Sequence, residues 1–394
     1  MELTSSHVMN TYGRFPVAIV SGDGRRVKDA DGREYLDFTS GLAVCNLGHC
    51  HPDVVEAIRE QAGTLLHISN LYHIEPQARL AKLLTDNSFG DKVFFCNSGA
   101  EANEAAMKLV RKYFSLKGSK RFQIITMEKS FHGRTFGALA ATGQKKFQEG
   151  FAPLLEKFTY VPFNDIKAVK SAINDSTAAV MVEPIQGEGG VNVPHEAYLK
   201  ELRAVCDSSG ILLVFDEVQS GVGRTGKLFA HEHWGATPDI MTLAKGLAGG
   251  VAIGAMIAAD AVAKAFTPGT HASTFGGNPL ATAAGLATLN VVINKGALEN
   301  CVKSGDYLVE KLNALKKDYP FIIEVRGKGL LIGVELADGI KGTDIVRESL
   351  ARGLLLNCVG DKVLRFIPAL TVTKDEIDEM IAILRTVLGA VQKA

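Results

Sequence analysis

The chain has 394 residues, of which 46% are hydrophobic and 22% charged, enough for a large core and about two domains. Lys plus Arg equals Asp plus Glu at 43 each, so no net charge attracts nucleic acid or an anionic membrane, and small molecules are the expected partners. Six scattered cysteines without a C-x-x-C pair, and an N-terminus without an apolar signal segment, predict a cytoplasmic protein. No apolar run reaches the length of a membrane span.

The N-terminal and central segments predict a hairpin followed by an α/β unit. The sequence RRVKDADGREYLDF favours a β-hairpin that turns at Asp31-Gly32. From Val93 to about Ile257, apolar runs alternate with helical patterns, which predicts a mostly parallel sheet covered by helices. The runs are VFFC, FQIITM, AAVMVE, ILLVFD, IMTLA and VAIGAMI. Residues Glu101 to Tyr113 have the apolar spacing of a helix that packs on this sheet.

The C-terminal third has a different pattern. EVRGKGLLIGVEL and KVLRFIP predict strands, and the last segment predicts an amphipathic helix with a capping box formed by Thr373 and Glu376. We therefore predict a large domain of residues 51–290 and a smaller α+β domain. The smaller domain combines an N-terminal segment, residues 1–50, with residues 291–394.

Two apolar strands end in residues that suggest chemistry. Asp216 ends the run ILLVFD, and Lys245 follows the run IMTLA directly. Ligands bind at the carboxyl ends of the strands in open α/β sheets, so both side chains are expected at such a site. A lysine that loses part of its hydration there favours the neutral amine that Schiff-base chemistry requires.

Two glycine-containing turns suggest phosphate binding. Asn97-Ser98-Gly99-Ala100-Glu101 follows a strand and opens a helix, where backbone N–H groups and the Ser98 hydroxyl suit an anion, although an ordinary serine-capped turn explains this segment equally well. Gly221 to Lys227 has the glycine and lysine spacing of a nucleotide P-loop. We reject that interpretation, because Leu228 stands where a magnesium-binding hydroxyl is required and the acidic strand comes directly before the glycines.

Further charged and aromatic residues follow other strands. Phe131 and Arg134 in FHGRT suit stacking on a flat cofactor and binding of a carboxylate, or else a core phenylalanine and a solvated arginine. Glu188 lies in a glycine-rich loop, where an acid in water is the usual alternative. Arg365 interrupts an apolar strand, so it needs a carboxylate partner.

No metal site is predicted from the histidines. His49-Cys50-His51 and His231-Glu232-His233 lack a recognised ligand spacing. The first is interpreted as a capped turn and the second as an exposed helix start.

Together these motifs resemble the class III, fold-type I pyridoxal-phosphate aminotransferases over nearly the whole chain, and within them the acetylornithine aminotransferases. The resemblance rests on six segments in family order: FCNSGAEANEAAMKL, SFHGRT, VEPIQGEGG, FDEVQSGVGRTG, TLAKG and THASTFGGNPLA.

The resemblance implies pyridoxal 5′-phosphate as the cofactor. Lys245 would bind it covalently and shuttle a proton, and Asp216 would pair with the pyridinium nitrogen. Other cofactor contacts are implied for Ser98, Gly99 and Ala100 at the phosphate, Phe131 on the ring, Gln219 near the ring hydroxyl, and Glu217 and Val218. Thr274 would reach the phosphate of a neighbouring subunit, which implies a homodimer with shared active sites.

The resemblance also implies how substrates bind. Arg134, with Ser273 from across the interface, would bind the α-carboxylate end of the amino donor. Arg365 would bind the α-carboxylate of glutamate or 2-oxoglutarate, and Glu188 would mask it when the other substrate is bound. Such masking would change the charge pattern of the site without rebuilding the pocket.

The expected reaction converts N2-acetyl-L-ornithine and 2-oxoglutarate to N-acetyl-L-glutamate 5-semialdehyde and L-glutamate, a step of arginine biosynthesis. Ornithine aminotransferases carry a tyrosine where Leu42 aligns. Leu42 cannot satisfy a free ammonium, which favours an acylated donor. Succinylornithine, succinyl-diaminopimelate, ornithine and 4-aminobutyrate remain alternative donors.

Other chemistry on the same fold is a competing hypothesis. A racemase, aminomutase or decarboxylase would not need the two carboxylate-binding arginines Arg134 and Arg365. A non-catalytic or nucleotide-binding protein would lack Asp216 or Lys245, or would carry a hydroxyl in place of Leu228.

Overall fold

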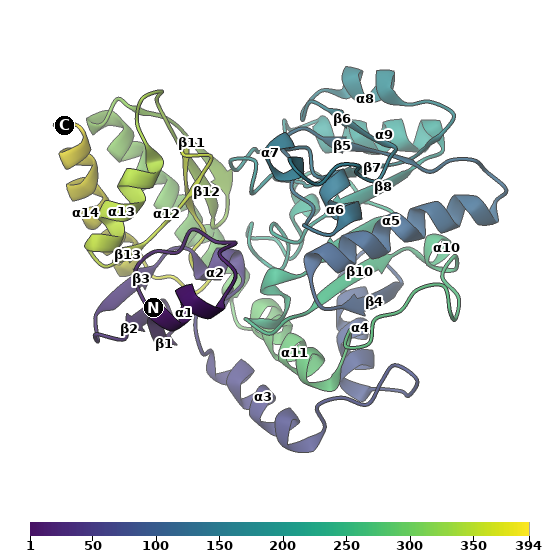
Figure 1. Ribbon diagram of the computed structural model, residues 1–394, viewed down its shortest axis with the longest axis horizontal. Coiled ribbons are helices and arrows are strands. Elements are labelled where there is room, and N and C mark those ends of the chain that lie inside the picture. The colour runs from purple at the N-terminus through teal and green to yellow at the C-terminus, as the bar shows by residue number, and fades with distance from the viewer. Residues whose placement is uncertain (394) are drawn as a thin grey trace.

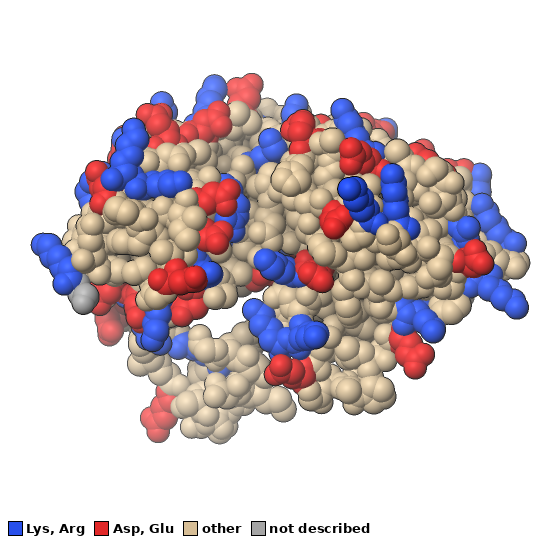
Figure 2. Space-filling view, turned by 90° about the horizontal axis from the view of Figure 1, so that it is seen from above, with Lys and Arg blue, Asp and Glu red and all other residues tan. Residues whose placement is uncertain are grey.

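The structure is a computed structural model that describes residues 1–393, so the last residue of the predicted C-terminal segment, Ala394, lies outside the described residues. Figure 1 shows two lobes, with the chain start beside the lobe that contains the C-terminal helices. Lys and Arg are interspersed with Asp and Glu over the face presented in Figure 2, as the equal counts of both charges suggest. None of the helices among residues 1–393 is both long enough and apolar enough to cross a membrane.

The larger lobe contains a seven-stranded sheet in the order β4-β10-β9-β8-β7-β5-β6. Its strands are β4 (Lys92–Cys96), β5 (Gln123–Met127), β6 (Phe158–Val161), β7 (Thr177–Val182), β8 (Leu212–Asp216), β9 (Ile240–Leu243) and β10 (Gly254–Ala258). The α/β prediction of a mostly parallel sheet is confirmed, with β10 running antiparallel to both of its neighbours. The sequence prediction missed β6, a short edge strand in which only Val161 is buried.

The central strands are apolar throughout because helices cover both faces of the sheet. In β8, Leu213 and Phe215 pack with α9 (Tyr198–Ser209), whereas Leu212 and Val214 pack with α5 (Gly99–Leu116). The remaining helices and 3-10 turns of the first 294 residues are α1 (Glu2–His7), α2 (Ser40–Ala43), α3 (Pro52–Thr64), α4 (Glu75–Asp86), α6 (Phe136–Ala141), α7 (Lys145–Gln148), α8 (Ile166–Ala172), η1 (Ala230–His233), η2 (Lys245–Ala248), α10 (Asp260–Ala263) and α11 (Pro279–Asn294).

The smaller lobe contains two four-stranded sheets. One has the order β1-β2-β3-β13, so the N-terminal hairpin pairs with a C-terminal strand, and the other has the order β11-β12-β15-β14. The strands are β1 (Ile19–Asp23), β2 (Arg26–Asp29), β3 (Glu34–Asp37), β11 (Ile322–Lys328), β12 (Leu331–Leu336), β13 (Leu354–Leu355), β14 (Asn357–Val359) and β15 (Val363–Phe366). The helices are α12 (Ala297–Asp318), α13 (Gly342–Ala351) and α14 (Lys374–Val391).

Local signals in this lobe agree with the sequence. The hairpin at Asp31-Gly32 is formed by β2 and β3, and the capping box of Thr373 and Glu376 starts α14. The boundary predicted after residue 290 falls inside α11, which continues to Asn294. The division into residues 1–50, 51–290 and 291–394 stays a prediction about folding units.

Candidate active site

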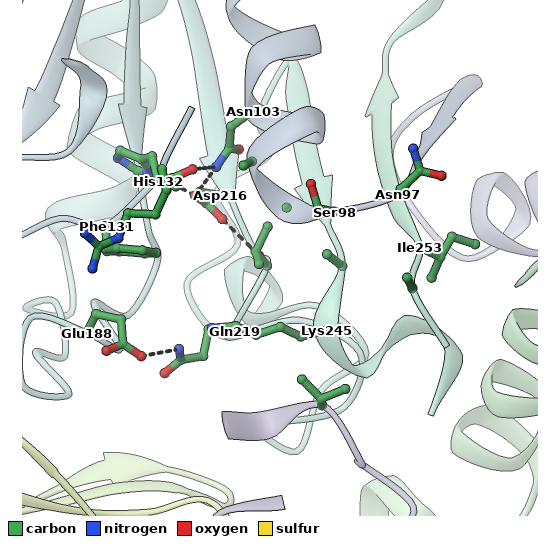
Figure 3. Close-up of a pocket in the computed structure, with 18 of the residues that line it drawn as sticks. Asn97, Ser98, Asn103, Phe131, His132, Glu188, Asp216, Gln219, Lys245 and Ile253 are labelled. Atoms are coloured by element: carbon green, nitrogen blue, oxygen red, sulfur yellow. Dashed lines mark hydrogen bonds and ion pairs between the residues drawn. The ribbon is translucent and has the colours of Figure 1, made fainter. Parts of the chain in front are cut away.

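A cavity of about 420 Å³ lies where β5, β7, β8 and β9 end and α5 begins. Because these strands are parallel, the residues that follow them meet at one edge of the sheet. Ten predicted site residues line the cavity: Ser98, Gly99, Ala100, Phe131, Arg134, Glu188, Asp216, Val218, Gln219 and Lys245. Figure 3 shows several of them pointing into the cavity from opposite sides.

Ser98 begins α5 at the cavity, where the backbone N–H groups of a helix start can bind an anion. Ser98 caps α5: its Oγ accepts from the Glu101 N–H at 3.2 Å and donates to Glu101 Oε2 at 3.0 Å. The other N–H groups of the first turn have no partner within the helix. Gly99 packs against Val218, because a Cβ at Gly99 would lie 2.7 Å from Val218 Cγ1. A glycine here therefore lets the turn approach the loop that follows Asp216.

Asp216 is fixed by three donors. Its Oδ2 accepts from Asn103 Nδ2 and from His132 Nδ1, both at 2.7 Å, and its Oδ1 accepts from the Val218 N–H at 3.0 Å (Figure 3). Thr242 Oγ1 donates to Asn103 Oδ1 at 2.7 Å and so fixes the amide in turn. The buried carboxylate thus has one defined orientation, as a charge aimed at a ligand requires.

Lys245 starts η2 two residues after the end of β9, with φ 40°, a left-handed conformation that is uncommon outside glycine. The next residue is glycine, where a Cβ would lie 2.0 Å from Asn46 Nδ2, an amide group that is bound to Val222 and Arg224. Burial lowers the pKa of the Lys245 ammonium, and the nearby Arg365 lowers it further, although Glu188 and other acids oppose them. The site therefore favours the neutral amine more than water does.

Two aromatic rings flank Arg134, and one of them, that of Phe131, lines the cavity. The guanidinium carbon of Arg134 lies 4.1 Å from the ring centre of Phe147 and 5.5 Å from that of Phe131. The Phe131 N–H donates to Glu183 Oε2 at 3.0 Å. Burial and the neighbouring Asp216 raise the pKa of Glu183 well above its usual value.

Arg365 and Glu188 form the pair that the sequence predicted. The Arg365 Nη1 atom lies 2.6 Å from Glu188 Oε1, and Gln219 contacts both side chains, at 3.0 Å and 3.2 Å. Asn357 Oδ1 accepts from Arg365 Nε and Nη2 at 3.0 and 2.7 Å. Burial alone would raise the pKa of Glu188, but Arg365 and Lys245 lower it to about 2. Arg365 itself does not line the cavity, whereas its partners Glu188 and Gln219 do.

The other predicted residues lie outside the cavity. Ser273 contacts it only through Asn97, whose Nδ2 donates to Ser273 Oγ at 3.2 Å, and Thr274 is exposed on the same loop. Leu42 is 44% exposed in a left-handed turn, and Val44, two residues later, lines the cavity instead.

Glu217, which was predicted to contact the cofactor, has a carboxylate that lies away from the cavity. The Glu217 carboxylate does not reach the cavity, because it accepts from the backbone N–H groups of Ala230 and His231, at 2.6 and 2.8 Å, and contacts His231 Nδ1 at 2.8 Å. The expectation of an exposed helix start at residues 231–233 is wrong for His231, which is buried by this pairing. His49 pairs with Asp37 at 2.8 Å, and residues 1–393 contain no cluster of three metal-binding side chains.

Three buried polar residues of the site had no assigned role from the sequence. Asn103 was detectable as an amide on the apolar face of α5, and His132 as part of FHGRT. Glu183 directly follows the apolar strand β7, much as Asp216 is the last residue of β8. What the sequence did not give is that Asn103 and His132 converge on Asp216.

Comparisons with known proteins agree with this geometry. The model of the family described as aminotransferase class-III matches residues 8–388. Acetylornithine aminotransferases from Caldanaerobacter subterraneus and Methanocaldococcus jannaschii are 55% and 52% identical to the chain, covering 98% and 100% of it and 98% of each relative.

Solved structures give the same fold. The ornithine aminotransferase from Toxoplasma gondii superposes with a TM-score of 0.96 at 35% identity, covering 100% of this chain and 94% of that one. The N-acetylornithine aminotransferase from Stenotrophomonas maltophilia has a TM-score of 0.86 at 39% identity, covering 99% of both chains.

The fold and the site define a pyridoxal-phosphate-dependent enzyme of fold type I. The chain belongs to the class-III aminotransferase family and is a transaminase that uses pyridoxal 5′-phosphate.

Proposed function

We propose that this enzyme moves the distal amino group of N2-acetyl-L-ornithine to 2-oxoglutarate, giving N-acetyl-L-glutamate 5-semialdehyde and L-glutamate, in arginine biosynthesis. The observation that carries the proposal is the identity of 55% and 52% to two acetylornithine aminotransferases over nearly the full length. The ornithine aminotransferase with the similar fold is only 35% identical, so fold similarity alone does not favour ornithine.

The cavity fits the cofactor. Ser98, Gly99 and Ala100 would hold the phosphate at the start of α5, and Phe131 would lie against the ring. Asp216, oriented by Asn103 and His132, would pair with the ring nitrogen. Gln219 and Val218 complete the proposed contacts, whereas the Glu217 side chain is left out because it is bound elsewhere. When bound, pyridoxal phosphate supplies an electron-withdrawing ring that stabilises charge at the reacting carbon.

Lys245 would bind the cofactor through its amine and, once released, would move a proton at the reacting carbon. The lowered pKa of its ammonium supports both tasks, since a nucleophile and a base both need the neutral amine. Its strained conformation at the end of β9 keeps the amine in the cavity that Asp216 also lines.

Two different substrates must use the same site in turn. Arg365 would bind the α-carboxylate of glutamate or 2-oxoglutarate, and Arg134, which borders the cavity, would bind the carboxylate end of the acylated donor. The contact of Glu188 with Arg365 at 2.6 Å is the arrangement expected when the donor is bound, because that donor leaves Arg365 without a substrate carboxylate.

A further argument for an acylated donor comes from Leu42, two residues before Val44 of the cavity lining. Leu42 offers no hydrogen bond to a free ammonium, and an acylated nitrogen carries no charge that needs one.

A homodimer with shared sites is part of the proposal. The loop that carries Ser273 and Thr274 is bound to segment 65–72, since Asn70 Nδ2 donates to the carbonyls of Ser273 and Gly276 at 3.1 and 2.9 Å. Large apolar side chains are exposed beside it: Leu65, Leu66, Ile68, Leu71, Tyr72 and Phe275. An apolar patch of this kind favours a protein partner, and a second copy would bring Ser273 and Thr274 to its neighbour's site.

Single-turnover absorbance changes of the bound cofactor test the proposal with acetylornithine, succinylornithine, ornithine and 4-aminobutyrate as donors. We expect the highest kcat/KM for acetylornithine, and conversion of the cofactor to its amine form by glutamate alone. A preference for free ornithine or 4-aminobutyrate would overturn the donor assignment. Failure of glutamate to convert the cofactor would overturn transamination.

A further inference from the structure

Three adjacent strands of the smaller lobe place two arginines in one row. Arg326 on β11 is paired with Gly333 on β12, and Gly333 is paired with Arg365 on β15. Directly paired residues of antiparallel strands point to the same face of a sheet. The two arginines therefore lie on one face, roughly 10 Å apart across two strand spacings, with only a glycine between them.

The loop that carries Glu188 is bound along this row. At its far end, Arg326 Nη2 donates to the Gly190 carbonyl at 2.7 Å, and Arg326 Nε donates to the carbonyls of Gly190 and Val191 at 3.2 and 3.1 Å. The Arg326 Nη1 atom is bound by Glu324 at 2.7 Å and by Glu335. The planar guanidinium thus joins two acids of its own sheet to the backbone of a loop from the larger lobe.

Gly333 gives the loop the space that it needs. A Cβ at Gly333 would lie 3.0 Å from the Cβ of Val191 and 3.2 Å from its Cγ2. Val191 is fully buried with φ 55°, a conformation that a β-branched residue keeps only when its surroundings hold it. The row therefore fixes the loop at Val191 independently of the Glu188 carboxylate.

A second cavity leaves room on the outer side of the loop. It measures about 670 Å³ and is lined by Glu188, Gly189, Gly190, Arg326 and Lys129, among others. Glu188 lines both this cavity and the active site, so its side chain separates the two spaces.

We propose that Arg326 is a positioning residue that holds the Glu188 loop on the sheet of Arg365, so that switching between substrates moves the Glu188 side chain and leaves the loop backbone in place. The inference rests on the proposed function for its kinetic consequence, because only a donor without an α-carboxylate at Arg365 needs Glu188 there. The loop attachment itself is a property of the fold.

The kinetic test compares Arg326→Gln with the matched control Arg385→Gln, which breaks the exposed ion pair to Asp318 in the same lobe. Arg326→Gln should lower kcat/KM of the acetylornithine half-reaction about tenfold and change the glutamate half-reaction less than about twofold. Arg326→Lys keeps the positive charge facing Glu324 and Glu335 but lacks the planar guanidinium that binds the loop carbonyls. It should therefore show most of the same loss in kcat/KM. Adding Arg326→Gln to Glu188→Gln should lower kcat/KM of the acetylornithine half-reaction little further, because both variants act through the contact between Glu188 and Arg365. Equal losses in both half-reactions, or losses that multiply in the double variant, would overturn the proposal.

A second measurement does not depend on the reaction. The amides of Val191 and Asn192 donate within the loop to Gly187 and Gln186, at 3.4 and 3.1 Å, so their hydrogen exchange reports on loop attachment. In the holoenzyme, Arg326→Gln and Arg326→Lys should speed this exchange about tenfold or more, whereas Glu188→Gln should not change it. Fast exchange in Glu188→Gln, or slow exchange in both Arg326 variants, would show that Arg326 does not hold the loop. If the wild type did not use acetylornithine but exchange behaved as expected, the proposed function would fail and the positioning role would stand.

Discussion

Glu188→Gln is the sharpest test of how one site serves two substrates. The change removes one charge from a pair whose atoms lie 2.6 Å apart and keeps the size of the side chain. Removing one partner of a fully buried ion pair costs roughly 3–5 kcal/mol. Gln still accepts a hydrogen bond from Arg365, and the Glu188 side chain is 27% exposed, so we expect a cost below that range, about 2 kcal/mol.

This cost should fall on one half-reaction. With acetylornithine bound, Arg365 has no substrate carboxylate beside it, and about 2 kcal/mol corresponds to a loss of about 30-fold in kcat/KM. With glutamate bound, the α-carboxylate of the substrate replaces Glu188, so the loss should stay below about threefold. Because the pKa of Glu188 is held at about 2, protonation of this residue should not contribute to the pH dependence of the wild type between pH 5 and 9.

The assay is single-turnover absorbance of the bound cofactor with each substrate alone. Glu348→Gln, which removes an exposed acid from a surface ion pair with Arg352, is the matched control and should leave both half-reactions unchanged. Equal losses in the two half-reactions of Glu188→Gln would refute the reasoning, because they would mean that Glu188 serves the cofactor or the fold and does not select substrates.

Three other variants test the remaining site assignments. Lys245→Ala should lower kcat by about 10⁴-fold or more, since it removes both nucleophile and base, and turnover at the normal rate would contradict the mechanism. In the apoprotein, the rate at which Lys245 binds the cofactor should rise with pH around a midpoint below 10.5. Arg365→Gln should move that midpoint upward, because Arg365 lowers the pKa of Lys245. A downward shift would contradict this electrostatic account. Asn103→Ala removes a donor at 2.7 Å from Asp216 and should weaken cofactor binding by about tenfold in equilibrium dialysis, whereas Asn87→Ala at the surface should not; unchanged affinity would mean that Asn103 does not orient Asp216.

Much of the fold was predictable because its signals are local. Apolar runs marked six of the seven strands of the large sheet, and the Thr373 capping box marked the last helix. Strand direction was not readable from such runs, so the antiparallel β10 came only from the structure. The edge strand β6 was missed because its four residues, FTYV, are too few to show a periodic pattern.

The site was predictable in part for the same reason. Some site residues could be predicted because they lie at the ends of elements, where a polar residue interrupts an apolar pattern. These are Asp216, Lys245 and the turn at Ser98. The roles of Asn103 and His132 were harder to predict, because each depends on a hydrogen bond to Asp216, which is 113 and 84 residues away in the chain.

The sequence by itself determined the elements and the residues that follow each strand, since hydrophobic period, caps and glycine turns act over a few residues. Tertiary structure alone decided which of those residues meet. Glu217 and Asp216 are neighbours in the chain, yet one carboxylate faces the cavity and the other binds the backbone of η1. Arg326 and Arg365 share a row only through the register of three strands. Pairing register and side-chain direction depend on packing between distant segments, and no local pattern encodes them.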